Sequence, residues 1–163
     1  VHFVPTRDGI PVDCDGRFER FARNLHDAYN DDLRYVVEKY FEQVLTMIEC
    51  GGFDILGHLD KISANAAKAD PDIENTGWYK ALIEDVINHA ASSGLTVEIN
   101  TKSYNDTRRF FPALQWWTEL LRSGAHIVIN SDAHYPDKVN AGRPEALRII
   151  EQLKSGSIPS AEI

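Results

Sequence analysis

Apolar residues recur every three or four positions over several long stretches of the chain, and short continuous apolar runs lie between these stretches. The first pattern predicts amphipathic helices, and the second predicts strands that are buried on both faces. We expect helices over residues 18–30, 31–50, 73–92, about 112–124 and about 144–153. We expect strands over residues 1–5, 53–57, 95–99 and 126–130, with a loop over residues 6–16.

Helices and strands alternate along the chain, with glycines at the short turns between them. This order is typical of parallel βα units. The sequence therefore predicts an α/β fold in a single domain over residues 1–163, since no internal repeat and no long linker divides the chain. Four strands are too few to close a barrel, so either the sheet is open or further strands precede residue 1.

Side chains capable of chemistry gather where the predicted strands end. His58 follows one strand, Glu98 and Asn100 end the next, and Asp132 and His134 follow the last. In parallel α/β folds, sites are assembled at this edge of the sheet. Residues two apart in a strand face the same side, so the last pair can present a carboxylate and an imidazole to one cation or to two adjacent ones.

Each of these residues also has an ordinary structural interpretation. Asp132 could cap a turn with His134 on the surface, and His58 could be a hydrogen-bonded structural residue. Glu98 could face solvent between inward-facing neighbours, because an unpaired carboxylate inside an apolar strand is costly. His2 alone would be dismissed as part of a frayed terminus, but it could add an imidazole from its own strand end. The repetition at three strand ends favours a functional site.

A cationic stretch follows the strand that contains Glu98. Lys102, Arg108 and Arg109 lie beside the proposed site in a chain whose net charge is −8. Three cations in that position indicate a receptor for a phosphate group, although a solvated loop would have the same composition. The chain has no glycine-rich nucleotide loop and no nucleophilic serine or cysteine motif, which removes most cofactor and nucleophile chemistries.

Composition narrows the setting and the partners. The acidic balance, 25 carboxylates against 17 basic residues, disfavours broad attraction to nucleic acid. The apolar runs are far shorter than the roughly 18 residues that a membrane-spanning helix requires, so we expect no membrane association. Two cysteines, Cys14 and Cys50, do not form a disulfide framework or a zinc motif, which fits a reduced, cytoplasmic protein.

Taken together, the motifs resemble those of the PHP (polymerase and histidinol phosphatase) metallohydrolases, and most closely the histidinol-phosphatase branch. The resemblance rests on four segments in the family's order and approximate spacing: Val1–Phe3, Phe53–Asp60, Glu98–Thr101 and Ser131–His134. It covers nearly the whole chain. It implies a distorted (β/α)7 TIM-like barrel, of which this chain would form the carboxyl-terminal part.

The resemblance also implies a metal centre of two or three divalent ions, Zn, Mn or Fe, in the complete enzyme. It implies that the metal ligands include His2, His58, Asp132 and His134. The implied activity is hydrolysis of a small phosphate monoester, histidinol phosphate, with Asp132 or His134 as candidate general acids.

The remaining residues would then act on the substrate. Glu98 and Asn100 would lie near it, and Lys102, Arg108 or Arg109 would hold the outer phosphate oxygens. The family's first motif, a His-x-His pair, has no counterpart here, so we expect the carboxyl-terminal portion of a longer enzyme that could be inactive alone. Two alternatives stay open: a phosphoesterase for nucleotides or nucleic-acid ends, and a truncated module without catalysis.

Overall fold

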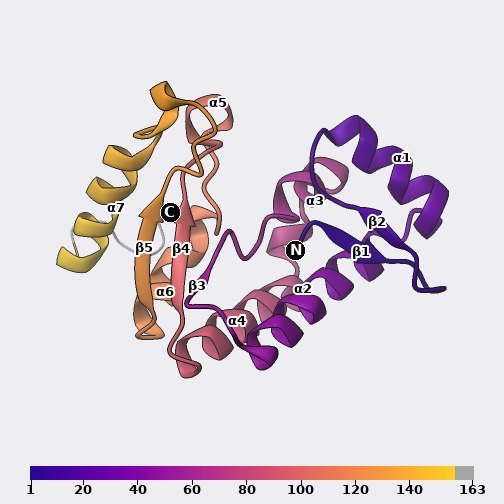
Figure 1. Ribbon diagram of the computed structural model, residues 1–163, viewed down its shortest axis with the longest axis horizontal. Helices are drawn as coiled ribbons and strands as arrows, with labels where there is room; N and C mark the ends of the chain where they lie inside the picture. Colours follow the sequence, from indigo (N-terminus) through magenta and orange to yellow (C-terminus); the bar gives the residue numbers. More distant parts are fainter. Residues whose placement is uncertain (157–163) are drawn as a thin grey trace. The chain divides into compact units, whose positions relative to one another are not determined.

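The computed structural model describes residues 1–156 and shows a mixed α/β fold that contains a parallel sheet (Figure 1). The chain folds into two compact units. The first, here called the hairpin unit, comprises Val1–Gly51 and Asp60–Val86. The second, the sheet unit, comprises Gly52–Leu59 and Ile87–Ile163. We describe each unit separately, and the single domain expected over residues 1–163 stays a prediction.

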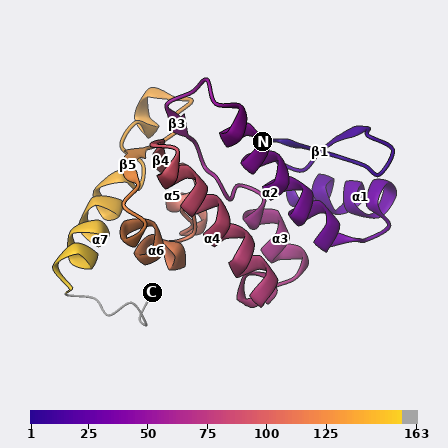
Figure 2. The same ribbon diagram turned by 90° about the horizontal axis from the view of Figure 1, so that it is seen from below.

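The hairpin unit is built on a short antiparallel pair of strands, β1 (Phe3–Pro5) and β2 (Pro11–Asp13). Three helices pack with this pair and with one another (Figures 1 and 2): α1 (Phe18–Tyr29), α2 (Leu33–Cys50) and α3 (Ser63–Ala69). The unit also contains the 3-10 turn η1 (Ile73–Asn75) and the first part of α4 (Gly77–Ser92).

Helix α2 shows how the predicted pattern produces this packing. Its apolar positions fall on one broad face, and six of its side chains are buried: Val36, Val37, Tyr40, Phe41, Val44 and Ile48. The side chain of Asp32 caps the amino end by accepting a hydrogen bond from the Tyr35 N–H at 3.0 Å. Gly51, with a φ of +63°, ends the helix in a conformation that favours glycine.

The loop expected over residues 6–16 is partly wrong, because it contains β2. The turn between the strands includes Asp8-Gly9, where the Gly9 N–H donates to the Thr6 carbonyl at 2.9 Å. Gly9 has a φ of +81°, which a glycine adopts without strain. The expectation that His2 lies at a strand end beside the other site residues is therefore wrong for the described sheet. His2 instead precedes β1, a strand of an antiparallel hairpin.

The sheet unit contains three parallel strands in the order β3-β4-β5 (Figure 1). They are β3 (Ile55–Leu56), β4 (Thr96–Asn100) and β5 (His126–Asn130). The unit also holds the end of α4 and the following helices: α5 (Tyr104–Thr107), η2 (Leu114–Trp116), α6 (Trp117–Arg122), η3 (Pro136–Lys138) and α7 (Arg143–Ser155). Helix α7 packs beside β5.

Burial differs between these strands. Strand β4 lies in the middle, and its apolar residues Val97 and Ile99 are fully buried. The strand expected over 53–57 is shorter than predicted, with Leu56 buried and Ile55 half exposed. The apolar residues of β5 are only partly buried. The described residues thus confirm a parallel α/β arrangement, and within them the sheet is open rather than closed into a barrel.

Candidate functional site

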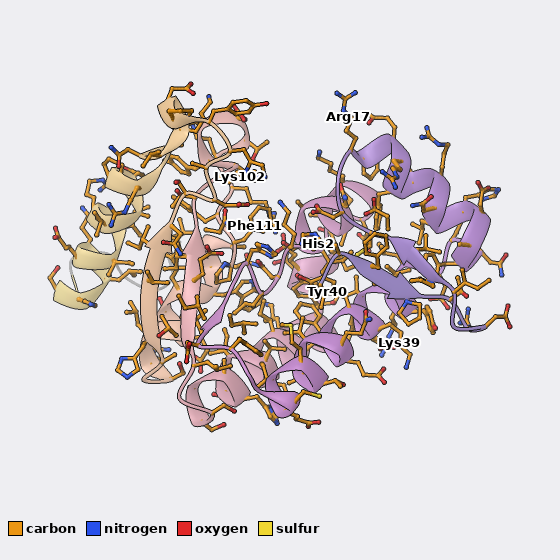
Figure 3. All side chains as sticks on the ribbon, viewed as in Figure 1. His2, Arg17, Lys39, Tyr40, Lys102 and Phe111 are labelled. Atoms are coloured by element: carbon orange, nitrogen blue, oxygen red, sulfur yellow. The ribbon has the colours of Figure 1, made fainter. Side chains whose placement is uncertain are left out.

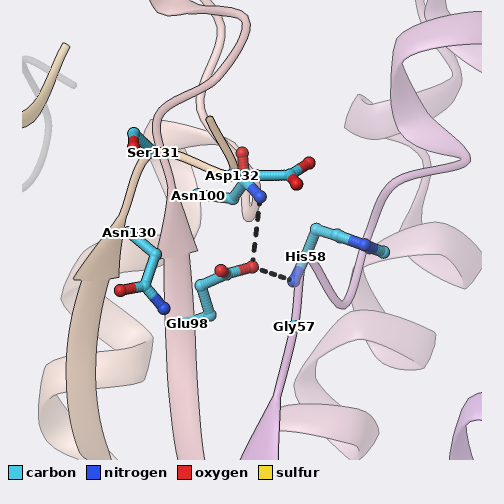
Figure 4. A pocket seen from close by; sticks show the side chains of 7 residues that line it. All are labelled: Gly57, His58, Glu98, Asn100, Asn130, Ser131 and Asp132. Carbon is cyan, nitrogen blue, oxygen red and sulfur yellow. Dashed lines mark hydrogen bonds between the residues drawn. The ribbon is translucent and has the colours of Figure 1, made fainter. Parts of the chain in front are cut away.

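The parallel register of the sheet unit brings three strand ends to one edge. Strand β4 pairs with both neighbours, so Glu98 lies opposite Val128, and Asn100 lies opposite Asn130. The residues at this edge line a cavity of about 410 Å³ (Figure 4). They are Gly57, His58, Glu98, Asn100, Asn130, Ser131 and Asp132. Four of the nine residues singled out from the sequence therefore line one cavity.

Glu98 is the buried anchor of this cavity. Only 7% of the residue is exposed, so the solvent-facing interpretation is wrong. Its Oε2 accepts hydrogen bonds from the His58 backbone N–H at 2.9 Å and from the Asn100 Nδ2 at 3.2 Å (Figure 4). A Cβ at Gly57 would lie 3.3 Å from the same oxygen, so the glycine leaves room for the carboxylate. These contacts offset the cost of burying Glu98.

The backbone is unusual at two of the predicted metal ligands. His58 has a φ of +32°, and Asp132 has a φ of +47°. Residues other than glycine rarely adopt positive φ values, and such conformations gather at functional sites, where the surrounding structure holds them. Figure 4 shows both side chains pointing toward the right of the view. The strain therefore supports a functional rather than a purely structural role for this edge.

Asp132, His134 and Lys102 form a polar cluster at the same strand ends. Lys102 is labelled in Figure 3. Its Nζ donates to Asp132 Oδ2 at 3.0 Å and lies 3.4 Å from His134 Nε2. The His134 Nδ1 lies 2.8 Å from the backbone oxygen of Asp132 and 3.8 Å from its Oδ1. The structure thus brings together the pair predicted from the spacing, with an ammonium group beside both members.

The cluster keeps Asp132 ionised. Partial burial raises its pKa, but the hydrogen bond and charge of Lys102, the charge of His134 and a bond from Asn100 outweigh burial. The pKa of Asp132 therefore lies below the ordinary value for an aspartate. Asn100 also accepts the Lys102 backbone N–H at 3.0 Å, which fixes the start of the loop that carries the lysine.

The three cations predicted to hold phosphate lie in different surroundings. Lys102 belongs to the polar cluster. Arg108 stacks on the Tyr104 ring at 5.1 Å and lines a separate cavity of about 540 Å³ with Asn105 and Asn140 among its residues. Arg109 lies 5.8 Å from the centre of the Phe111 ring. Lys102 directly contacts two other predicted site residues, Asp132 and His134.

In the hairpin unit, His2 is held by a carboxylate that the sequence analysis missed. The His2 Nδ1 lies 2.8 Å from Asp15 Oδ2, and Lys61 Nζ lies 4.0 Å from Asp15 Oδ1. Burial raises the pKa of Asp15, but the Gly16 N–H, the charge of Lys61 and the bond from His2 lower it below its ordinary value. Only the Asp8-Gly9 turn, a common hairpin signal, could have suggested that residues 2 and 15 approach each other.

The neighbouring cysteine is a less suitable donor. Cys14 is buried and donates from its Sγ to the His2 carbonyl at 3.2 Å, while its backbone N–H donates to the same oxygen at 2.9 Å. Burial, with the nearby Asp15 and Asp13 carboxylates, raises the pKa of the Cys14 thiol to about 12. Because thiolates are the form that binds metals, Cys14 remains a structural thiol, and its bonds fix the His2 backbone.

These residues fit a divalent metal in donor type and ring orientation. Imidazole nitrogens and carboxylate oxygens are the donors that Zn and similar ions bind. In both His2 and His134, Nδ1 contacts an oxygen, so a neutral ring carries its lone pair on Nε2, an arrangement usual for metal-binding histidines. Within residues 1–156, however, no three His, Cys, Asp or Glu side chains form a group able to hold an ion.

Comparisons with known proteins bear on the fold and on the sequence of the chain as a whole. No family model matches the chain. The crystal structure of a "putative histidinol phosphatase" from Listeria monocytogenes superposes with a TM-score of 0.75 at 17% identity, covering 89% of this chain and 55% of that one. The two proteins therefore share an α/β fold over almost all of the present chain.

A second comparison, at the level of sequence, gives a relative of the chain. The chain is 31% identical over 120 residues to the "Probable histidinol-phosphatase" of Clostridium acetobutylicum, which covers 71% of the chain and 46% of the relative. The resemblance to histidinol-phosphatases is thus confirmed, and the chain is a relative of a protein that carries this name. It spans about half the length of the relatives it matches. Within the described residues, no helix is long and apolar enough to cross a membrane.

Proposed function

We propose that the protein carrying this chain is a metal-dependent phosphomonoester hydrolase that acts on histidinol phosphate. The observation that carries the proposal is the edge of the sheet unit, where His58, Glu98 and Asp132 line one cavity. Lys102 adds a cation directly beside Asp132. The names of the two relatives supply the substrate.

The chain's own residues would divide the work between binding the ions and binding the ester. His2, His58, Asp132 and His134 would hold divalent ions, Zn, Mn or Fe. When bound, such ions lower the pKa of a water molecule and neutralise phosphate oxygens.

The ester would be bound and protonated by groups that the chain also supplies. Lys102 would donate a hydrogen bond from its ammonium group to an outer phosphate oxygen. Hydrogen bonds between ionised partners are shorter and stronger than those between neutral ones. Glu98 and Asn100 would hold the cavity in shape through the hydrogen bonds that they share, with Asn100 oriented toward the substrate. Arg108 and Arg109 stay candidate phosphate contacts. Of the two candidate general acids, Asp132 is ionised beside Lys102, so His134 stays the candidate for donating the proton that the leaving alcohol requires.

We further propose that the complete protein adds strands to this sheet and closes a distorted barrel around it. The partly buried apolar residues of β5, Ile127, Val128 and Ile129, support additional cover at that strand. The short β3 would gain partners as well, because a two-residue strand with an exposed Ile55 contributes little by itself. The added half would supply the metal donors that the described residues lack.

Phosphate release by the full-length protein tests this function. The protein would be stripped of metal, reloaded with Mn²⁺ or Zn²⁺, and assayed with histidinol phosphate beside other small phosphate esters and nucleotides. We expect release that depends on the added metal and is fastest with histidinol phosphate. Faster release from nucleotides or nucleic-acid ends would contradict the substrate assignment. A metal-loaded protein that is inactive on every ester would identify a non-catalytic module.

A further inference from the structure

We propose that Asp15 is a positioning residue that fixes the tautomer of His2, so that Nε2 is the atom that His2 presents to a divalent cation. This inference rests on the proposed function only for the kind of ligand. The arrangement itself is visible in the hairpin unit, where Asp15 Oδ2 and His2 Nδ1 lie 2.8 Å apart. Neither residue type nor spacing indicates this pairing, because the two are thirteen residues apart in the chain.

Hydrogen bonds from the hairpin and from helix α3 fix the backbone around both His2 and Asp15. The His2 carbonyl accepts bonds from the Cys14 backbone and thiol, which fixes the start of β1 against the end of β2. Asp15 is fixed by its backbone N–H, which donates to Asp13 Oδ1 at 2.8 Å. Asn65 of α3 donates to the Cys14 and Gly16 carbonyls on either side of Asp15. The carboxylate therefore approaches the ring from a defined direction.

The charge on Asp15 then selects one form of the ring. An ionised carboxylate only accepts hydrogen bonds, so the His2 nitrogen beside it must carry the proton. In a neutral imidazole the other nitrogen, Nε2, holds the lone pair. The Asp15 side chain is only 29% exposed, which limits the directions from which water can reach it, and Lys61 Nζ lies 4.0 Å from its second oxygen. Carboxylates in this position orient metal-binding histidines and increase their basicity.

A second His–Asp pair in the same unit provides an internal reference. His26 Nδ1 lies 3.0 Å from Asp31 Oδ2, but this pair is exposed, at 73% and 67% of the two side chains. No cysteine, asparagine or lysine contact like those around Asp15 is present at that pair among the described residues. Asp31 thus has the same chemistry as Asp15 without the fixed surroundings, and Asp31→Asn is the matched control for changes at Asp15.

The experiment measures the His2 tautomer and the affinity for Zn²⁺ in the full-length protein. Long-range ¹⁵N–¹H correlations identify which ring nitrogen of His2, His26 and His134 is protonated. Competition with a chelator gives the Zn²⁺ dissociation constant. Asp15→Ala removes the acceptor, and Asp15→Asn keeps an oxygen for the Gly16 N–H in case the first variant does not fold.

We expect wild-type His2 to carry its proton on Nδ1, and we expect Asp15→Ala to lose that preference and weaken Zn²⁺ binding by about 10- to 100-fold. Asp15→Asn should weaken it less, and Asp31→Asn should leave it unchanged. The proposal is overturned if a folded Asp15 variant keeps both the tautomer and the affinity of the wild type. If the Asp15 variants bind Zn²⁺ more weakly but the wild-type protein has no phosphatase activity, the role of Asp15 stands and only the proposed function is rejected.

Discussion

The two units fix an imidazole in different ways. In the sheet unit, His134 is held by its own neighbour in the chain, because its Nδ1 contacts the backbone oxygen of Asp132 at 2.8 Å. In the hairpin unit, His2 is held by Asp15, which reaches it only because β1 and β2 pair. In both arrangements Nε2 carries the lone pair of a neutral ring. The first depends on three consecutive residues, Asp132 to His134, and the second depends on a folded hairpin.

The units also differ in the partner that balances their carboxylates. Asp132 contacts the Lys102 ammonium directly at 3.0 Å, whereas Lys61 is 4.0 Å from Asp15. Lys102 also approaches His134 Nε2, the atom expected to bind metal. A positive ion at this cluster must therefore share Asp132 and His134 with Lys102 or displace it. In the hairpin unit, Lys61 lies beside Asp15 rather than beside the His2 ring. A metal ion at His2 Nε2 would therefore not compete with this lysine.

The largest effect should follow a change at the sheet-unit carboxylate. Asp132→Asn keeps a residue that tolerates positive φ but removes the charge, so we expect phosphate release to fall by about 10²- to 10⁴-fold. Steady-state assays of the full-length protein with histidinol phosphate measure the loss. Asp137→Asn, in the exposed turn η3, is the control and should be silent. If both variants retained full activity, the strand ends of the sheet unit would not be the catalytic edge.

The next effect concerns stability rather than activity. Glu98→Ala removes the acceptor for the His58 N–H and for Asn100, so one part-buried and one buried donor lose their partner. We expect the free energy of unfolding to fall by about 1–3 kcal/mol, measured by urea denaturation. Glu84→Ala, on the exposed side of α4, should change it little. An unchanged midpoint for Glu98→Ala would mean that this edge is not held together by the glutamate.

A smaller effect is expected at Lys102, the cation that distinguishes the sheet unit. Lys102→Met keeps the length of the side chain and removes its charge, and we expect KM for the phosphate ester to rise by about tenfold, roughly 1.4 kcal/mol. The same change should allow the pKa of Asp132 to return toward its ordinary value, because Lys102 lowers it. Lys138→Met is the matched control. A KM that did not move would assign Lys102 to charge balance alone.

The smallest effect belongs to the exposed reference pair of the hairpin unit. The hydrogen bond and charge of Asp31, followed by the charge of Asp27, raise the pKa of His26 above 6.5. The pair therefore stabilises the fold below the ordinary histidine pKa, and this contribution is lost as the pH rises through the raised value. NMR titration should show the His26 pKa falling in Asp31→Asn. An unaltered pKa would show that the exposed pair does not form in solution.

The parts of the site that the sequence predicted are those that depend on local order. Strand runs of apolar residues with polar ends gave the positions of Glu98, Asp132 and His134, because parallel strands bring their carboxyl ends to one edge. Asp15 was missed because its role depends on the register of a hairpin whose second strand has only three residues. The sequence alone does not decide whether Glu98 is buried, since only the neighbouring strands and Gly57 determine which way it faces.

The elements of the fold that the sequence predicted are likewise those with a clear local pattern. The long helices α1, α2 and α4 agree with their apolar spacing, although the predicted helix over 73–92 begins with the separate turn η1. The short helices α3 and α5 were not predicted, because seven and four residues are too few for a periodic pattern. The barrel implied by the resemblance extends beyond a chain that spans about half of its relatives, so it stays a prediction.

The most direct test of the central claim is a crystal structure of the full-length protein loaded with Zn²⁺. An anomalous difference map from data collected at the zinc absorption edge would locate the metal. We predict metal peaks about 2.0–2.2 Å from His134 Nε2, from a carboxylate oxygen of Asp132 and from His2 Nε2, with Lys102 moved away from His134. Metal bound elsewhere, or bound through Nδ1 of either histidine, would contradict the claim that both units present Nε2 to a divalent ion.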